Sequence, residues 1–295
     1  MAKGLREINT RIKSVKSTAQ ITKAMQLVAS SKMRRAQDSA VAGRNYGWLL
    51  ADLLDSALRT RDSHCEHPLV RKREPLVRGI LLISTDKGLC GALNPNLFRL
   101  LKDVPPNTHF VAIGRKGAQH IARTGRTLLA NFTIPDNVSF SGVRVISDYL
   151  LKNYCEGRID TLEILYPRFR NTLIQEPVLY PILPIEDIHA AIVATRAQGG
   201  PEQQADTPDD RRTMHFEPDS KAIFAELPSL YCRHAIYHAM LEAKASEHSA
   251  RMVAMKAATD NARQITENLT LEYNKARQAA ITQEINEITA AALAK

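Results

Sequence analysis

The strongest candidate for chemistry in this chain is a glycine-bearing loop, Ser84–Gly91 (STDKGLCG), between a strand-like run and a helix-like run. Parallel α/β folds bind phosphates at this position, because backbone N–H groups at a helix N-terminus can face the anion. The established phosphate loops need the spacing GxxxxGK[ST] or GxGxxG, and neither occurs in the sequence. We therefore interpret the segment as a structural glycine turn with a packed Cys90, and we expect no bound cofactor.

A second glycine pair, Gly114–Gly117 (GRKG), resembles the loop with which KH domains clamp a nucleic-acid backbone. The KH loop joins two helices, whereas this one follows the strand-like run His109–Ile113. An ordinary strand-to-helix turn is therefore the favoured interpretation.

Two histidines, His234 and His238, lie four residues apart and would share a helix face, as zinc ligands do. The glutamate of the HExxH motif is absent, since Ala235 stands in its place. The four cysteines are too far apart for a CxxC pair and indicate reduced thiols. No serine, cysteine or carboxylate constellation argues for catalysis, so the sequence predicts no catalytic residue and no metal site.

The elements that must position these residues are indicated by the prolines, all 14 of which lie between Pro68 and Pro228. Ser229–Lys295 contains neither glycine nor proline and is rich in strong helix formers, so it predicts one very long helix. Near the N-terminus, apolar residues recur at alternating steps of three and four, which is typical of a coiled-coil seam: Leu5, Ile8, Ile12, Val15 and Ala19.

Helix length decides how these two segments are arranged. At 1.5 Å per residue the helices would be about 100 and 80 Å long, whereas a compact globule of this size is roughly 50 Å across. The helices must therefore protrude, and because one enters the central region and the other leaves it, they should pair antiparallel. The far part of the seam is expected at Ile265, Leu269, Tyr273, Ala276, Ala280, Ile281, Ile285, Ile288 and Ala292. Its many alanines bury little area, so we expect a sleeve around the coil.

The central region, residues 69–195, alternates strand-like and helix-like pieces. Strands are expected at 77–84, 109–113, 161–166 and 177–183, and helices at 92–101, 118–123 and 147–155. This alternation predicts an α/β domain with a small parallel or mixed sheet and helices on its faces.

The charge of the chain is concentrated near its N-terminus. Of a net charge of +9, a surplus of about eight lies between Lys3 and Arg44, where ten basic residues face only Glu7 and Asp38. An acidic partner, whether nucleic acid, anionic lipid or protein, is therefore expected to contact the first helix. No run approaches the ~18 to 20 apolar residues of a membrane span, and no signal peptide is apparent, so a soluble protein made on the cytoplasmic side is expected.

Four stretches, in the same order and spanning both ends and the middle of the chain, closely resemble the gamma subunit of F-type ATP synthases. They are Ile21–Gln37 (ITKAMQLVASSKMRRAQ), Ser84–Asn94 (STDKGLCGALN), Ala245–Asn261 (ASEHSARMVAMKAATDN) and Tyr273–Glu284 (YNKARQAAITQE). The resemblance implies a central stalk, in which an antiparallel coiled coil turns inside three alpha and three beta subunits and a Rossmann-like α/β domain sits on the membrane c-ring. It also implies one non-catalytic rotor copy per complex, turned by proton-driven rotation of the ring.

The resemblance also assigns contact residues. Met25 matches the methionine of the family's ITKAM run, which faces the beta subunits, and Arg251, Gln278 and Thr282 match residues that look like the contacts catching beta. Residues Phe216, Glu217 and Asp219 (FEPD) resemble the YEPD segment of the foot, near the ring and the epsilon subunit. Phenylalanine replaces the usual tyrosine there, so no contact through that hydroxyl is expected.

The resemblance completes the predicted organisation. The domains are an N-terminal coiled-coil helix (1–68), a central α/β domain (69–195), a polar loop and foot segment (196–218) and a C-terminal coiled-coil helix (219–295). The absence of a transit peptide and of the chloroplast cysteine insert favours a bacterial protein, peripheral on the cytoplasmic face of the plasma membrane. A basic coiled-coil nucleic-acid-binding protein and an α/β enzyme with a pocket in residues 69–195 are the alternatives.

Overall fold

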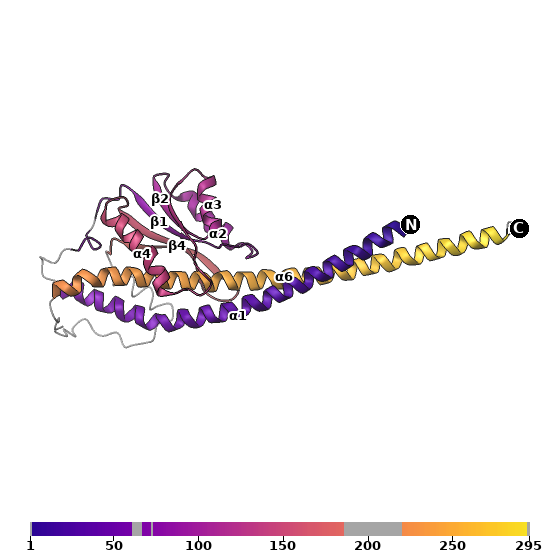
Figure 1. Ribbon diagram of the computed structural model, residues 1–295, viewed down its shortest axis with the longest axis horizontal. Helices are drawn as coiled ribbons and strands as arrows, with labels where there is room; N and C mark the ends of the chain where they lie inside the picture. Colours follow the sequence, from indigo (N-terminus) through magenta and orange to yellow (C-terminus); the bar gives the residue numbers. More distant parts are fainter. Residues whose placement is uncertain (1, 61–66, 72, 186–219, 294–295) are drawn as a thin grey trace. The chain divides into compact units, whose positions relative to one another are not determined.

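The computed structural model describes residues 2–60, 67–71, 73–185 and 220–293 (Figure 1). The chain forms two compact units, one of residues 1–31 and 251–295 and the other of residues 32–250. Two long helices, α1 (Ala2–Thr60) and α6 (Ser220–Leu293), contribute to both units.

Helix α6 begins nine residues before Ser229, so it contains Pro228, which the sequence placed at the edge of the proline-free segment. A proline inside a helix removes one backbone hydrogen bond and costs about 3 kcal/mol. The neighbouring side chains of Phe224, Leu227 and Cys232 are buried in the core of the second unit, and this packing offsets the cost.

In the first unit, burial on α1 follows the predicted seam and confirms it. The seam residues are buried or half-buried and the residues between them are exposed: Leu5, Ile8, Ile12, Val15 and Ala19. The stripe continues through Thr22 and Ala29, which are buried. A narrow face of α1, about one residue in every three or four, therefore forms the coil.

On α6 the predicted seam is partly wrong. The buried or half-buried stripe is Met255, Thr259, Ala262, Thr266, Leu269, Tyr273, Ala276 and Ala280. Ile265 is 47% exposed, because the buried stripe runs through Thr259 and Thr266 instead. A search for apolar residues alone does not find these threonines. Ile281, Ile285 and Ile288 are also exposed, because α6 continues beyond the N-terminal end of α1 (Figure 1).

The second unit contains a five-stranded sheet in the order β3-β2-β1-β4-β5. Its strands are β1 (Arg78–Ile83), β2 (Thr108–Ile113), β3 (Thr127–Phe132), β4 (Thr161–Phe169) and β5 (Gln175–Leu183). The first four run parallel to their neighbours, and β5 pairs antiparallel with β4. The prediction of a parallel or mixed sheet is confirmed, the sheet being mixed, with β3 as a strand that the sequence analysis did not expect.

Three helices and a short 3-10 turn connect the strands. They are α2 (Leu93–Leu100), η1 (Leu101–Asp103), α3 (Arg115–Arg123) and α4 (Phe140–Cys155). Helix α4 begins seven residues before its predicted start, because the Ser139 side chain caps it by accepting a hydrogen bond from the Gly142 N–H.

The sheet is covered on both faces, because side chains of a strand point alternately to either side. Ile80 and Leu82 of β1 pack with α2 and α3, whereas Leu81 and Ile83 belong to a larger core that includes α4 and the helix pair α1 and α6. Within this unit Tyr46 contacts His234, and the Ala40 backbone lies at His238, so α1 and α6 run antiparallel as predicted.

One stretch of α6 is enclosed on every side. From Ala239 to Ser249 every residue is buried except Lys244, whose side chain is 12% exposed. Most surface helices bury only one stripe, so this stretch behaves as a core helix. Five of its buried residues are polar, and their contacts are made both within α6, as between Lys244 and Glu247, and with other segments, as between Ser249 and Thr172: Glu242, Ser246, Glu247, His248 and Ser249.

Candidate functional site

The loop after β1 is closed by its own hydrogen bonds. The Asn94 side chain accepts from the Thr85 N–H (3.4 Å) and donates to the Thr85 Oγ1 (2.7 Å), which in turn donates to the Lys87 carbonyl (2.8 Å). Cys90 is 3% exposed, with its Sγ 3.5 Å from the Asn94 Nδ2. The interpretation of this segment as a structural turn with a packed cysteine is therefore confirmed.

The GRKG segment forms the strand-to-helix junction, as predicted, with Gly114 between β2 and α3 and Arg115–Gly117 in the first turn of α3. Gly114 has φ +95°, and a Cβ on it would lie 2.4 Å from the Ser84 carbonyl oxygen. Gly117 donates its N–H to the Ser84 Oγ (2.8 Å), and that hydroxyl donates to the Ile113 carbonyl (3.0 Å). The two glycines are needed because the end of β1, at Leu82 and Ser84, approaches both positions too closely for a side chain.

Open α/β sheets bind ligands at the carboxyl ends of their strands, where the strand order reverses, which here is between β1 and β4. At this position α6 covers the strand ends. The remaining cavity, of about 10 Å³, is lined by Thr85 and Pro167 from the sheet and by Met240, Lys244 and Glu247 from α6. It has room for about one water molecule. Helix α6 therefore occupies the crevice in which related folds hold a nucleotide.

The two histidines on α6 face the first helix. His234 packs against Gly47, where an added Cβ would lie 2.7 Å from the histidine Cε1, and against the Tyr46 ring at 5.1 Å. Burial lowers the pKa of both His234 and His238 to about 4, so both are neutral at pH 7. Within the described residues, no group of three or more histidine, cysteine or acidic side chains is arranged to hold a metal ion.

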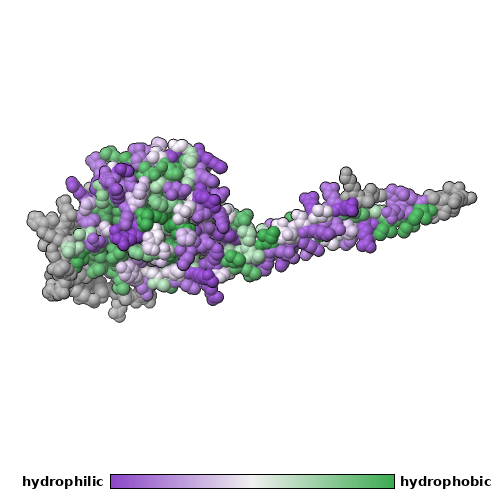
Figure 2. Space-filling view, viewed as in Figure 1, coloured by the Kyte–Doolittle hydropathy of each residue, from purple (hydrophilic) through white to green (hydrophobic). Residues whose placement is uncertain are grey.

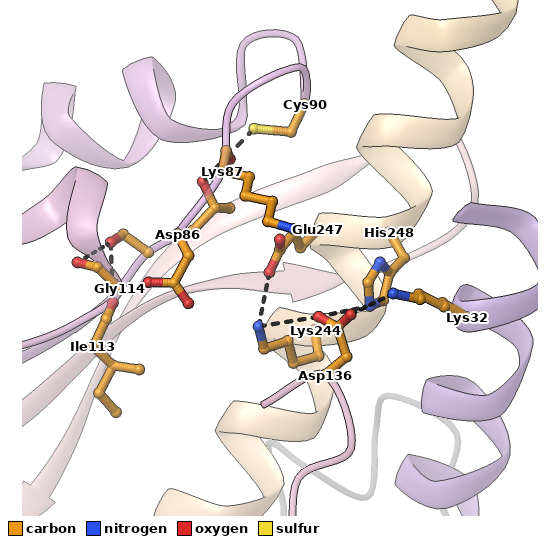
Figure 3. A network of polar contacts seen from close by, with 12 residues as sticks. Lys32, Asp86, Lys87, Cys90, Ile113, Gly114, Asp136, Lys244, Glu247 and His248 are labelled. Carbon is orange, nitrogen blue, oxygen red and sulfur yellow. Dashed lines mark hydrogen bonds and ion pairs between the residues drawn. The ribbon is translucent and has the colours of Figure 1, made fainter. Parts of the chain in front are cut away.

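A polar network joins three distant segments of the second unit (Figure 3). The Asp136 carboxylate accepts from Lys32 Nζ at 2.5 Å and lies 3.8 Å from both Lys244 Nζ and His248 Nε2. Lys244 also pairs with Glu247 at 3.2 Å, and the Lys87 side chain points toward Glu247. The hydrogen bond from Lys32, followed by the nearby positive charges, lowers the pKa of Asp136. The sequence analysis missed this network, because its members lie about a hundred residues apart.

The residues that the family resemblance assigns to beta contacts all lie in the first unit. Met25 and Arg251 are half-buried, whereas Gln278 and Thr282 are exposed one turn apart on α6, with the Thr282 hydroxyl bonded to the Gln278 carbonyl at 3.0 Å. Arg251 lies about seven helical turns before Gln278. The predicted foot residues are outside the described part of the chain: Phe216, Glu217 and Asp219.

The seam of the first unit contains a polar pair. Thr22 and Thr259 are 9% and 2% exposed, and their hydroxyl oxygens lie 2.8 Å apart across the two helices. A buried polar pair in a coiled coil favours the one register that brings its members together, at some cost in stability. This pair therefore fixes how α1 and α6 are aligned.

The outer surface of the coil carries large apolar side chains. On α1, Ile21, Leu27 and Val28 are 55–60% exposed, and Leu271 on α6 is 70% exposed. Figure 2 shows further apolar surface toward the C-terminal end of this unit, where Ile281, Ile285 and Ile288 lie on one helix face. Exposed apolar surface of this extent marks a contact with another protein.

These features define a structural subunit that acts through contacts with partner chains. Its coil is covered with side chains suited to a protein interface, and its α/β unit has the ligand crevice filled by its own helix. The family model for ATP synthase matches residues 4–294. The chain is 50% identical to the ATP synthase gamma chain of Opitutus terrae, and the match covers 98% of each of the two chains. It is 41% identical to the ATP synthase gamma chain of Methylacidiphilum infernorum, with 97% of each chain covered. The chain belongs to the ATP synthase gamma-chain family.

Solved structures show the same fold. The rotor of the Euglena gracilis mitochondrial ATP synthase matches 95% of this chain and 100% of its own, with a TM-score of 0.66 and 19% identity. A chain in the central stalk and c-ring structure of the Tetrahymena thermophila enzyme matches 81% of this chain and 99% of its own, with a TM-score of 0.58 and 22% identity.

Proposed function

We propose that this chain is the central-stalk rotor subunit of an F1Fo ATP synthase, coupling ion-driven rotation of the membrane ring to ATP synthesis at the beta subunits. The observation that carries the proposal is the antiparallel coil of a gamma-chain family member, with large apolar side chains exposed on its outer surface. A coil that worked alone would gain nothing from this exposure, whereas a shaft inside a protein sleeve needs it. The role is non-catalytic, with ATP formed on the beta subunits.

The partners we propose are three alpha and three beta subunits around the coil, together with the epsilon subunit and the membrane c-ring, with one copy of this chain per complex. The related structures support these partners, since they are structures of F1, the c-ring and the central stalk of mitochondrial enzymes. The basic N-terminal helix then meets an acidic protein surface and not a nucleic acid.

We place the chain on the cytoplasmic face of a bacterial plasma membrane, as a peripheral subunit of a proton-translocating enzyme. The two relatives named above are bacterial gamma chains, which supports this location. In the described parts of the chain, no helix combines the length and the hydropathy needed to cross a bilayer.

For the contacts with beta we propose Met25, Arg251, Gln278 and Thr282. The exposed amide of Gln278 and hydroxyl-bearing face of Thr282 suit hydrogen bonds to a partner, and the family motifs support the other two. For the contacts with the ring or epsilon we propose the FEPD segment, Phe216, Glu217 and Asp219.

The test of these contacts is substitution in the assembled enzyme. Arg251→Ala and Gln278→Ala should each lower ATP synthesis by membranes about tenfold or more, because a hydrogen bond to a charged group contributes about 1.5 to 3 kcal/mol. Gln264→Ala makes the same chemical change as Gln278→Ala at an exposed position outside the four family stretches and should leave synthesis near the parental rate. Parental rates in both test variants would contradict the contact assignment.

The rotor role itself is tested by purification. The tagged chain, isolated from its native membrane, should bring alpha, beta and epsilon subunits with it. Recovery of nucleic acid in their place, lost as salt is raised, would support the alternative and overturn the rotor proposal.

A further inference from the structure

A cavity of about 250 Å³ lies beside the polar network of the second unit. Lys32 and Arg35 of α1 line one side, Lys244 and His248 of α6 line another, and Asp136 and Asn137 from the segment after β3 complete it. All three wall segments therefore contribute polar side chains to one space.

Positive charge is in excess around this cavity. Three permanently charged cations line it, and Asp136 is the one carboxylate among the lining residues. Figure 3 shows Lys32, Lys244 and His248 converging on that carboxylate. Glu247 neutralises part of the Lys244 charge at 3.2 Å, yet Arg35 leaves the group net positive.

The burial of these groups strengthens their attraction for an anion. The Lys244 side chain is 12% exposed and that of His248 is 2% exposed, so both are largely shielded from water. Coulomb interactions at such a site are several times stronger than in bulk water. Arg35, by contrast, is exposed, and its guanidinium can close over an anion that has entered.

We propose that this cavity is a binding site for an inorganic phosphate group, either orthophosphate or pyrophosphate. Two ammonium groups and a guanidinium match the charge and the several acceptor oxygens of such an anion. The apolar part of the lining is Ala36, Val138 and Leu241, and the ring among the lining residues, the His248 imidazole, is 2% exposed with its Nε2 3.8 Å from Asp136, so it presents little face on which a nucleotide base could stack. The site therefore selects the bare anion over a nucleotide. Since its cations come from α1 and α6, a bound phosphate would bridge the two helices.

The proposal goes beyond the rotor role and is tested on the purified full-length chain. Pyrophosphate and orthophosphate are titrated by calorimetry at constant ionic strength, with ADP as the comparison. We expect saturable binding of pyrophosphate, and no tighter binding of ADP.

Two matched variants locate the site. Arg35→Gln should weaken pyrophosphate binding about tenfold or more through the loss of one charge. Arg34→Gln removes the same charge from the neighbouring exposed residue, which does not line the cavity, and should leave the affinity unchanged. Equal weakening by the two variants would show diffuse attraction to a basic helix and overturn the proposal, as would the absence of saturable binding.

A third variant separates an anion site from a purely structural network. Asp136→Asn removes the carboxylate that now faces the cations, so phosphate should bind about tenfold more tightly. If Asp136 serves structure alone, losing its ion pair with Lys32 would loosen the walls and weaken or leave unchanged any binding. Unchanged or weaker binding in this variant, or tighter binding of ADP than of pyrophosphate to the parent chain, would overturn the proposal.

Discussion

Replacing Thr22 and Thr259 by valine, singly and together, tests whether their hydrogen bond aligns the two helices of the coil. Valine has nearly the same shape as threonine, so the substitution removes the hydroxyl and leaves little cavity. Thr10→Val is the matched control, because Thr10 is exposed on the same helix and its hydroxyl donates to the Arg6 carbonyl one turn before it.

The structure sets the magnitude of the effect. Each hydroxyl has a second acceptor on its own helix, the Ala19 carbonyl at 3.1 Å for Thr22 and the Met255 carbonyl at 2.8 Å for Thr259. A single substitution therefore leaves the surviving hydroxyl with a partner, and it should cost only the net value of one hydrogen bond, about 1 kcal/mol. Because the second substitution removes no further bond between the helices, the double variant should lose no more than one single variant.

The assay is urea unfolding of the full-length chain, followed by the helical circular dichroism signal. We expect a coupling energy of about 1 kcal/mol between the two sites, with the dependence of stability on urea unchanged. Thr10→Val should lie within about 0.5 kcal/mol of the parent, as exposed substitutions usually do. If the double variant loses as much stability as the two single variants together, to within about 0.3 kcal/mol, the reasoning is refuted, since the two hydroxyls would then act independently.

Three further changes test other parts of the structure. Lys256→Pro should destabilise α6 by about 3 kcal/mol and abolish ATP-driven proton pumping by membranes, whereas Lys256→Ala at this exposed position should pump normally. Gly114→Ala should lower the thermal midpoint more than Gly125→Ala, because both positions have positive φ but only the first would press a Cβ against the Ser84 backbone. Lowering the pH from 6.5 to 4 should reduce the free energy of unfolding. Burial lowers the pKa of His234 and His238 to about 4 in the folded chain, whereas a histidine in the unfolded chain has a pKa near 6.5. The unfolded chain therefore binds protons over this range before the folded chain does, and is stabilised relative to it. Urea titrations across this range should show a smaller reduction in His238→Gln, and an equal one would contradict the assignment.

The parts of the fold that the sequence predicted are those encoded by local periodicity. The steps of three and four from Leu5 to Ala19 require no knowledge of the partner helix, and the structure buries those positions. The apolar runs of β1 and β2 likewise indicate buried parallel strands by composition alone.

The parts that failed depend on neighbours that are distant in sequence. Thr259 and Thr266 belong to the seam because a helix more than two hundred residues away faces them, and threonine carries no apolar signal. The edge strand β3 is only half-buried, so its sequence lacks the continuous apolar run of β1. The network around Asp136 forms only after three segments have been brought together by the fold.

The enclosed stretch of α6, from Ala239 to Ser249, has a mechanical consequence. A helix that buries one stripe can turn about its own axis by exchanging contacts along that stripe. A helix packed on all sides cannot turn without displacing every neighbour at once, including the connection between β4 and β5, where the Thr172 carbonyl accepts a hydrogen bond from the Ser249 hydroxyl at 2.7 Å. The α/β unit therefore prevents this stretch from rotating about its own axis relative to the unit. Torque applied to the α/β unit is transmitted directly to the helix.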